Sequence, residues 1–479
     1  MKSIYTNFIL ALFLSISSIA NSQILVSATD LGLFPKVIIS ASGLTNADYN
    51  VRMYKVTYNT SDLSGNPVVA SGMICVPINP TCDSLPVALY AHGTVLKRDD
   101  VPSGNNNESV IGKAIASKGY VTAMPDYLGL GDLMGLHPYQ HAESEAIVSV
   151  DILRAAKEFI ADSMNFTFSN EVFITGYSQG GHAAMATTKY IQDNNLGSEL
   201  NVVASAPLSG AFHASKRQTD ELLLDIPYNS PGYIVYLILS YQEAYGGIFT
   251  TPSDFLQSPY DTTIPPLFDG SVAMSVVHAA LPNKTSLYLN TTFLNAFIAD
   301  STAKTSALWQ ALLDNDNFDW KPTSKLKMFY CTGDQTVKPK NTEDAYDAMI
   351  ANGATQVFKE DLGATLDHGG CVVPAVSNAI TYFQGIRTDC KTPNGISENT
   401  NVAVQINTYP NPSTNFFTIE LKNDTEAKIE IYSLGGQLIY QTDIQKSIRI
   451  NTKKWQSGSY ALRVVSGNAQ TLKTFTVTH

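Results

Sequence analysis

Basic side chains are scarce in this sequence. Its 479 residues include 31 Lys and Arg against 42 Asp and Glu, which gives a formal net charge of -11. Nucleic acid binding needs a basic surface, and no basic stripe occurs along the chain, so we exclude nucleic acid as a partner. Metal-binding patterns are missing as well: no C-x-x-C pair occurs, and Pro138 opposes a helix that would align His137 with His141. We therefore expect no metal and no cofactor.

Long apolar runs are missing after the N-terminus. The one long run, Ile4–Ile19, follows Lys2 and precedes the small residues Ala20 and Ser22. This pattern is typical of a secretory signal peptide that is cleaved before Gln23. The run is short for a membrane span and contains Asn and Ser residues, so we expect an exported protein with no transmembrane segment in its mature form.

What the sequence does contain is a large apolar fraction, 44%, in alternating strand-like and helix-like patterns. Leu85–Tyr90 is a compact apolar run typical of a buried strand, and Glu143–Ile160 has one apolar helical face. Their spacing predicts parallel βαβ units. Val51–Tyr58 and Val68–Val76 predict an antiparallel hairpin at the edge of this sheet. The sheet is expected to resume at 325–331.

Changes in composition divide the chain into parts. Residues from about 213 to 321 interrupt the alternation with many tyrosines and prolines, which predicts a helical cap over the sheet. The polar stretch 387–403 predicts a linker. Beyond it, 404–479 has short alternating strands, which predicts a small all-β sandwich. We therefore expect a signal peptide at 1–22, an α/β domain at 23–386 that includes the cap, the linker and the sandwich.

A Gly-x-Ser-x-Gly motif lies at the centre of the α/β domain. A β-branched and aromatic run precedes Gly176, and small helix-forming residues follow Gly180. This order predicts a strand, a sharp turn and a helix, with the Ser178 hydroxyl exposed on the turn. A Cβ at either glycine would collide with the neighbouring backbone. The motif therefore predicts a nucleophile elbow, and the plainer alternative is an ordinary glycine-rich turn.

Two later residues complete a candidate catalytic triad. A serine hydroxyl needs a base to take its proton, and the base needs a carboxylate to orient it. In elbow-type hydrolases the chain order is serine, acid, histidine. Asp334 follows the strand at 325–331, and His368 is expected in a later loop. We predict Ser178, Asp334 and His368 as the triad, with Asp361 as the substitute acid.

The oxyanion that forms during attack needs two backbone donors. One is predicted to be the N–H of Gln179, the residue after the nucleophile. The other is predicted to be the N–H of Thr94, because His92-Gly93-Thr94 follows an early buried strand. Gly93 is expected to let the backbone approach closely.

Five cysteines follow the predicted signal peptide, and an exported protein can form disulfides. Cys75 and Cys82 flank a short loop and could form a local bridge. Cys331 and Cys371 each lie near a candidate catalytic residue and could tie those two loops together, or both could be buried free thiols. Because the number is odd, one cysteine must stay unpaired.

Residues from about 50 to 385 resemble the secretory lipase family of α/β-hydrolases. The matching stretches are Tyr90–Thr94, Pro125–Gly131, His137–Tyr139, Gly176–Gly181, Gly333–Asp334 and Asp367–His368. The resemblance implies hydrolysis of carboxylic esters, with Ser178, Asp334 and His368 as the triad. The cap matches no family pattern, so we expect substrate choice to lie there.

The C-terminal module resembles the sorting domain of type IX secretion in Bacteroidetes. Its matching residues are Tyr409–Pro412, Leu434–Gly436, Trp455–Gly458, Tyr460 and Val464. The resemblance implies recognition by the secretion machinery, export to the cell surface or beyond it, and later removal of the module. The alternative is a small carbohydrate-binding or adhesive sandwich.

Three functions remain open from the sequence. The first is a secreted serine lipase or esterase that cleaves a small-molecule or lipid ester through an acyl-enzyme. The second is an exopeptidase of the same fold, which would need an acidic cap residue such as Glu243, Asp254 or Asp269 to hold a substrate amine. The third is a surface-binding protein without catalytic activity.

Overall fold

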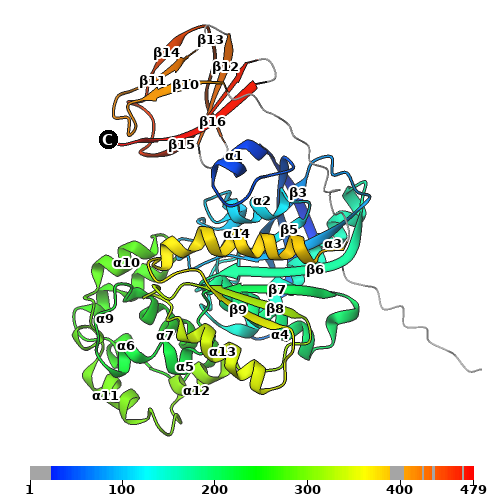
Figure 1. Cartoon of the computed structure of the whole chain (residues 1–479). Coiled ribbons are helices and arrows are strands. Elements are labelled where there is room, and N and C mark those ends of the chain that lie inside the picture. The colour runs from blue at the N-terminus through cyan, green and yellow to red at the C-terminus, as the bar shows by residue number, and fades with distance from the viewer. Residues whose placement is uncertain (1–22, 389–403, 423–425, 434–436, 467–468) are drawn as a thin grey trace, which may run out of the picture.

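A computed structural model describes residues 23–388, 404–422, 426–433, 437–466 and 469–479 (Figure 1). The predicted signal peptide at 1–22, most of the predicted linker, Leu434–Gly436 and Cys390 lie outside these residues. Within them, no helix is long and apolar enough to cross a membrane.

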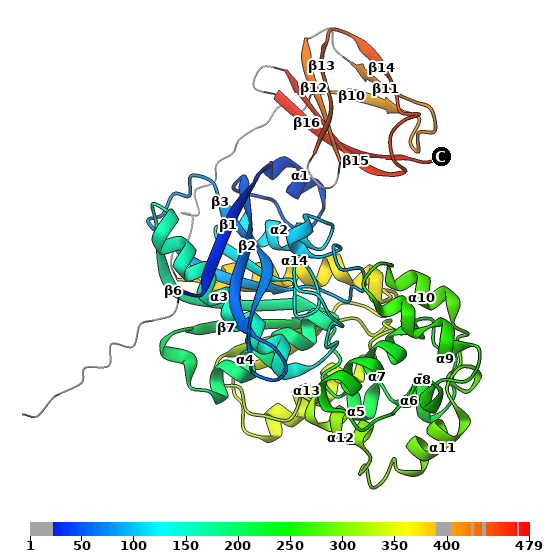
Figure 2. The ribbon, with the colours of Figure 1, turned by 180° about the vertical axis from the view of Figure 1, so that it is seen from behind.

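The centre of the molecule is a nine-stranded sheet with the strand order β1-β2-β3-β5-β4-β6-β7-β8-β9. Every pairing from β5 to β9 is parallel, whereas β1, β2 and β3 pair antiparallel at one edge (Figure 2). The predicted edge hairpin is β2–β3. The strands span Leu25–Phe34 (β1), Val51–Ser61 (β2), Pro67–Pro77 (β3), Ser84–Ala91 (β4), Val121–Pro125 (β5), Thr167–Tyr177 (β6), Val202–Leu208 (β7), Lys325–Tyr330 (β8) and Val357–Asp361 (β9).

Helices cover both faces of the sheet, and each face has its own hydrophobic core. On one face lie α1 (Lys36–Ala41), α2 (Ser109–Ala116) and α14 (His368–Ile386). On the other lie α3 (Ala142–Ser163), α4 (Gln179–Asp193) and α13 (Lys340–Ala351). The parallel strands are buried on both sides, which explains their near-continuous apolar sequences.

A helical cap connects β7 to β8 and has a hydrophobic core of its own. The cap is fixed to the sheet domain by α7, whose hydroxyl groups donate to backbone carbonyls. Tyr236 reaches Val95 O at 3.3 Å, and Ser240 reaches His137 O at 2.8 Å. Some of the cap tyrosines therefore serve docking. The cap helices are α5 (Ala214–Arg217), α6 (Asp220–Leu223), α7 (Gly232–Tyr245), α8 (Pro252–Phe255), α9 (Tyr260–Thr263), α10 (Met274–Ala280), α11 (Thr291–Ala299) and α12 (Ala307–Asp314).

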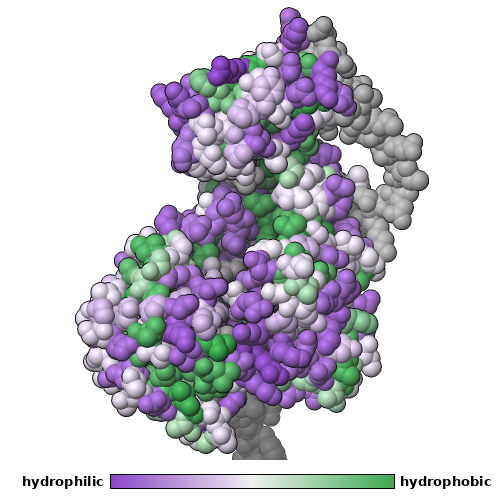
Figure 3. All heavy atoms as spheres, turned by 60° about the vertical axis from the view of Figure 1, so that its left-hand side comes forward, coloured by the Kyte–Doolittle hydropathy of each residue, from purple (hydrophilic) through white to green (hydrophobic). Residues whose placement is uncertain are grey.

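The surface of the cap is mixed. Figure 3 shows small apolar patches there among hydrophilic side chains. Leu224 and Leu287 are exposed on it, and single exposed apolar residues of this kind are ordinary on a protein surface.

The C-terminal module consists of two antiparallel sheets, β10-β11-β14 and β13-β12-β15-β16. Phe417 and Phe475 stack in its core with ring centroids 3.7 Å apart. The whole arrangement confirms the expected fold class, an α/β-hydrolase sheet with a helical cap insertion plus a small β-sandwich. The module strands are β10 (Ile406–Tyr409), β11 (Phe416–Leu421), β12 (Ala427–Ser433), β13 (Leu438–Ile444), β14 (Ser447–Asn451), β15 (Gly458–Ser466) and β16 (Ala469–Val477).

Candidate active site

Ser178 occupies a strained turn between β6 and α4. Its backbone angles are φ 61° and ψ -118°, a region that residues with a side chain seldom adopt. A Cβ on Gly176 would lie 2.2 Å from Gly180 O, and a Cβ on Gly180 would lie 1.9 Å from Ala91 O. Both glycines are therefore required by close backbone contacts, as expected for an elbow that presents its serine.

The structure brings Ser178, His368 and Asp334 into one hydrogen-bonded chain. His368 Nε2 lies 2.9 Å from Ser178 Oγ, and His368 Nδ1 lies 2.6 Å from Asp334 Oδ2. The carboxylate must accept from Nδ1–H, so Nε2 is free to accept the serine proton. The other oxygen of Asp334, which is 1% exposed, accepts from the N–H groups of Thr336 and Val337.

Asp361, the substitute acid, does not join this chain. Its carboxylate accepts from the backbone N–H and the hydroxyl of Thr332, at 3.0 and 2.9 Å. It therefore holds the loop that leads to Asp334 and makes no contact with the imidazole of His368.

The sequence predicted that His368 lies in a loop, and this is wrong. His368 is the first residue of α14. Asp367 caps this helix by accepting from the N–H of Gly370 at 2.7 Å. The Tyr177 hydroxyl donates to His368 O at 2.6 Å. His368 is thus held by a helix start and by Tyr177, the residue before Ser178.

A disulfide joins Cys331 to Cys371, with the two Cα atoms 6.1 Å apart. It ties the end of β8 to the start of α14, and each cysteine lies three residues from a member of the hydrogen-bonded chain. Of the two alternatives from the sequence, the bridge is therefore the one found.

The expected bridge between Cys75 and Cys82 is wrong, because Cys75 is a buried free thiol. Its side chain belongs to the hydrophobic core on the α2 and α14 face, whereas Cys82 packs against the core on the opposite face. The sheet therefore separates the two sulfur atoms. Cys82 is itself disulfide-bonded.

Gln179 and Thr94, the two residues predicted to hold the oxyanion, lie on two chain segments that pack against each other. Gln179 is the first residue of α4, so its N–H has no partner within the helix. Thr94 follows the end of β4, which packs directly against the elbow at Ala91 O. Gly93 was expected to permit a close backbone approach, and this is wrong: a Cβ there would meet no atom nearer than 3.6 Å.

The two histidines with metal-like spacing do not share a site. His137 Nδ1 contacts Leu128 O at 2.9 Å, and burial lowers its pKa to about 3. His141 caps α3, where its Nδ1 accepts from the N–H of Ser144. Across the described ranges, no group of three His, Cys, Asp or Glu residues could hold a metal ion.

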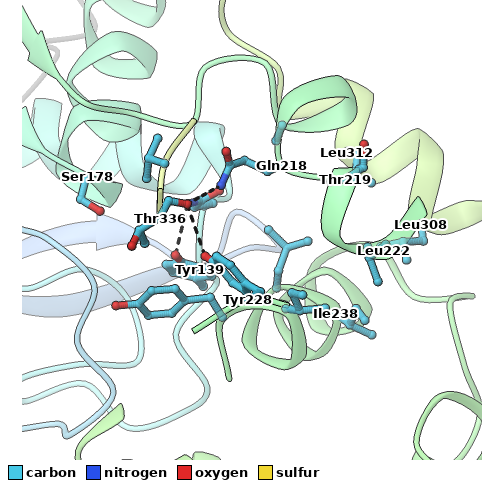
Figure 4. Close-up of a pocket in the computed structure, with 16 residues that line it drawn as sticks. Tyr139, Ser178, Gln218, Thr219, Leu222, Tyr228, Ile238, Leu308, Leu312 and Thr336 are labelled. Atoms are coloured by element: carbon cyan, nitrogen blue, oxygen red, sulfur yellow. Dashed lines mark hydrogen bonds between the residues drawn. The ribbon is translucent and has the colours of Figure 1, made fainter. Parts of the chain in front are cut away.

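A cavity of about 700 Å³, including its open mouth, lies between Ser178 and the cap (Figure 4). Near Ser178 it is polar, with Gln218 and Tyr228 donating to Thr336 O. Its far end is aliphatic and is formed by Leu222, Ile238, Leu308 and Leu312. No charged side chain of the described residues lines it.

Several solved structures of hydrolases share this α/β-hydrolase fold. A Legionella pneumophila protein assigned as a hydrolase is 29% identical, with a TM-score of 0.70, over 76% of this chain and 99% of its own. The rice cell wall degrading esterase LipA of Xanthomonas oryzae is 27% identical, with a TM-score of 0.67, over 76% and 97%. Candida antarctica lipase A in its closed state is 16% identical, with a TM-score of 0.55, over 78% of this chain and 85% of its own, so that likeness concerns the fold alone. The first two neighbours support the assignment of this chain as a hydrolase.

Residues 407–478 match the family described as the secretion system C-terminal sorting domain. This match confirms the expected type IX sorting domain and marks the protein for the cell surface or the extracellular space. A curated relative, the ulvan lyase NLR42 of Nonlabens ulvanivorans, is 28% identical over 140 residues, which are 28% of this chain and 25% of that one. The chain thus spans about a quarter of the length of that relative.

Proposed function

We propose that this protein is a secreted serine hydrolase that cleaves carboxylic esters through an acyl-enzyme. The observation that carries the proposal is the chain from Ser178 through His368 to Asp334, with contacts of 2.9 and 2.6 Å, at the mouth of an uncharged cavity. This arrangement supplies a nucleophile, a base and an orienting carboxylate in the roles that acyl transfer needs.

In the first half of the reaction, Ser178 Oγ attacks the ester carbonyl carbon while His368 Nε2 takes the hydroxyl proton. Asp334 stabilises the imidazolium that forms. The N–H groups of Gln179 and Thr94 donate to the tetrahedral oxyanion, and the N-terminus of α4 adds a favourable dipole. The intermediate collapses when His368 returns the proton to the alkoxide, which leaves as the alcohol, and the acyl group remains on Ser178.

In the second half, water attacks the acyl-enzyme while His368 takes one of its protons. The carboxylic acid leaves, and the proton returns to Ser178 Oγ. Both halves require His368 Nε2 to accept a proton, first from Ser178 and then from water.

The cavity supports a neutral substrate with an apolar part. An exopeptidase would need a carboxylate to hold the substrate amine, and the three acidic candidates have other environments. Asp254 caps α8 by accepting from the N–H of Thr250 and Thr251, Asp269 accepts from the N–H of Ser271, and Glu243 lines a different cavity. An ester with an acyl or alcohol group that fits the aliphatic end is therefore the better candidate.

The test is hydrolysis of p-nitrophenyl esters from acetate to palmitate by the mature chain, with Ser178→Ala beside it. We expect turnover that the variant loses. Preference for long chains would make the protein a lipase, and preference for acetate or butyrate a small-acyl esterase. Equal rates for both proteins would contradict the triad. Cleavage of aminoacyl amides but of no ester would favour the exopeptidase.

A further inference from the structure

A cluster of buried polar side chains lies directly behind the elbow, and none of these side chains takes part in the reaction described above. It joins Glu145 on α3 to Gln179 and His182 on α4, and it includes His137 and Asn315. Each of these side chains is at most 2% exposed. Burying a carboxylate at such a position is costly unless its hydrogen bonds are satisfied, so the contacts within the cluster define what it does.

The side-chain amide of Gln179 is held from two sides. Its Nε2 donates to Glu145 Oε1 at 2.8 Å and to His137 Nε2 at 2.6 Å. His137 can accept this bond because its Nδ1 carries the proton that goes to Leu128 O. Within the described part of the chain, Gln179 Oε1 has no hydrogen-bond partner, so the two donated bonds alone fix the amide.

The second oxygen of Glu145 binds His182. His182 Nδ1 lies 2.7 Å from Glu145 Oε2, and His182 Nε2 lies 3.0 Å from Asn315 O. Both ring nitrogens thus face acceptors. Burial disfavours the charged ring, but the Glu145 carboxylate and the Asn315 carbonyl outweigh it and raise the pKa of His182. Glu145 and His182 therefore form a buried ion pair.

The same cluster reaches the cap. Asn315 follows α12, and its side chain accepts from the N–H of Ala142 at 2.7 Å and donates to the Tyr245 hydroxyl at 2.8 Å. Asn317 donates to His182 O at 3.1 Å. One continuous set of hydrogen bonds thus runs from Gln179 to the segment after α12 and to the end of α7 in the cap.

We propose that Glu145 is a positioning residue for the oxyanion hole. Glu145 orients the backbone N–H of Gln179 by holding the Gln179 side chain, and it couples this orientation to the cap through His182. The inference rests on the proposed function. Gln179 begins α4, where the backbone has no preceding helical turn to fix it. An oxyanion donor is effective only in its correct direction, so a loosened Gln179 should lower kcat more than it weakens ground-state binding.

The test compares two replacements of Glu145 in the mature chain. Glu145→Leu removes both acceptors, and we expect kcat on p-nitrophenyl butyrate to fall about 10- to 100-fold, with KM within about threefold. Glu145→Gln can accept from Gln179 and donate to a neutral His182, so it should recover most of this loss. Asp151→Leu is the matched control, because Asp151 is a buried carboxylate on the same helix that pairs with Arg154. It should lower stability but not kcat.

Unchanged kcat in Glu145→Leu together with a lowered melting temperature would overturn the inference, because the cluster would then be merely structural. If Glu145→Leu does not fold, Gln179→Met decides. That variant keeps the backbone N–H but loses the amide, and the inference requires a similar fall in kcat. Wild-type turnover is measured in the same assay, so failure of the proposed function would appear separately, as an inactive parent.

Discussion

Asp334 lies after β8 and Asp361 is the last residue of β9, the neighbouring strand, and their hydrogen-bond partners give them different roles. Asp334 accepts from His368 Nδ1, whereas Asp361 accepts from Thr332. We expect Asp334→Asn to lower kcat on the order of 10³- to 10⁴-fold, because an amide no longer stabilises the imidazolium. Asp361→Asn should keep kcat within about threefold. Kinetics on the preferred ester check both variants, and a large loss in Asp361→Asn alone would reverse the assignment of the acid.

At this scale, the sequence predicts residues whose surroundings are fixed by short-range sterics. Ser178 is predictable because a Cβ on Gly176 would lie 2.2 Å from Gly180 O, a contact within the motif itself. Glu145 could not be predicted, because its partners on α4 come from a distant part of the chain and its sequence context is an ordinary acidic residue in a first helical turn. The ion pair of His182 depends on the same tertiary contact.

At the level of elements, the start of α3 depends on a histidine that titrates. Burial, together with the positive charge of His182, lowers the pKa of His141 to about 4. Its folded-state pKa is depressed, so its contribution to stability is present above the unfolded value near 6.5 and is lost as the pH falls. We expect His141→Asn, which keeps a good N-cap without titrating, to reduce the loss of unfolding free energy between pH 7 and pH 5 by about 2 kcal/mol.

Urea unfolding of both proteins at the two pH values measures this difference. Identical pH dependence in wild type and His141→Asn would show that the cap residue does not titrate in this range. A His141→Asn variant that is much less stable at pH 7 as well would instead mean that packing against Tyr245 dominates, since the two rings lie 5.3 Å apart.

The disulfide between the end of β8 and the start of α14 should stabilise the fold strongly. It closes a loop with a sequence separation of 40 residues, for which chain entropy gives about 4 kcal/mol. We expect the double variant Cys331→Ser, Cys371→Ser to lose stability of that order in urea unfolding, with a smaller effect on kcat because Tyr177 and Asp367 still hold the His368 segment. Cys75→Ala is the control, and a loss of the same size there would refute the entropic account.

Two elements, β1 and the start of α14, show why parts of the fold could not be predicted from the sequence. β1 has mostly exposed side chains and two register shifts, so no regular apolar alternation marks it. α14 begins at His368, where the sequence predicted a loop. Gly369 and Gly370 are poor helix formers, and the side-chain cap of Asp367 compensates for them.

At the scale of the whole molecule, the sorting module and the candidate active site lie apart. Ser178, Asp334, His368 and every residue of the cavity come from the first 388 residues. The module contacts α1 through β15 and β16, with Ala461 packed against the core on that side, and Figure 1 shows it at the end of the sheet domain away from the cap. Its location thus fits a sorting role that is independent of catalysis.

We therefore expect a chain that ends at residue 403, after the predicted linker and with all five cysteines kept, to retain kcat and KM on its preferred ester within about twofold of the mature full-length protein. Its melting temperature should fall slightly, because removal of β15 and β16 uncovers apolar surface beside α1. In a host with type IX secretion, the full-length chain should reach the medium or the cell surface, whereas the shortened chain should stay inside the cell envelope. A shortened chain that keeps its fold but loses kcat would mean that the module supports the active site through α1 and α2. These two helices pack on the same face of the sheet as α14, which carries His368.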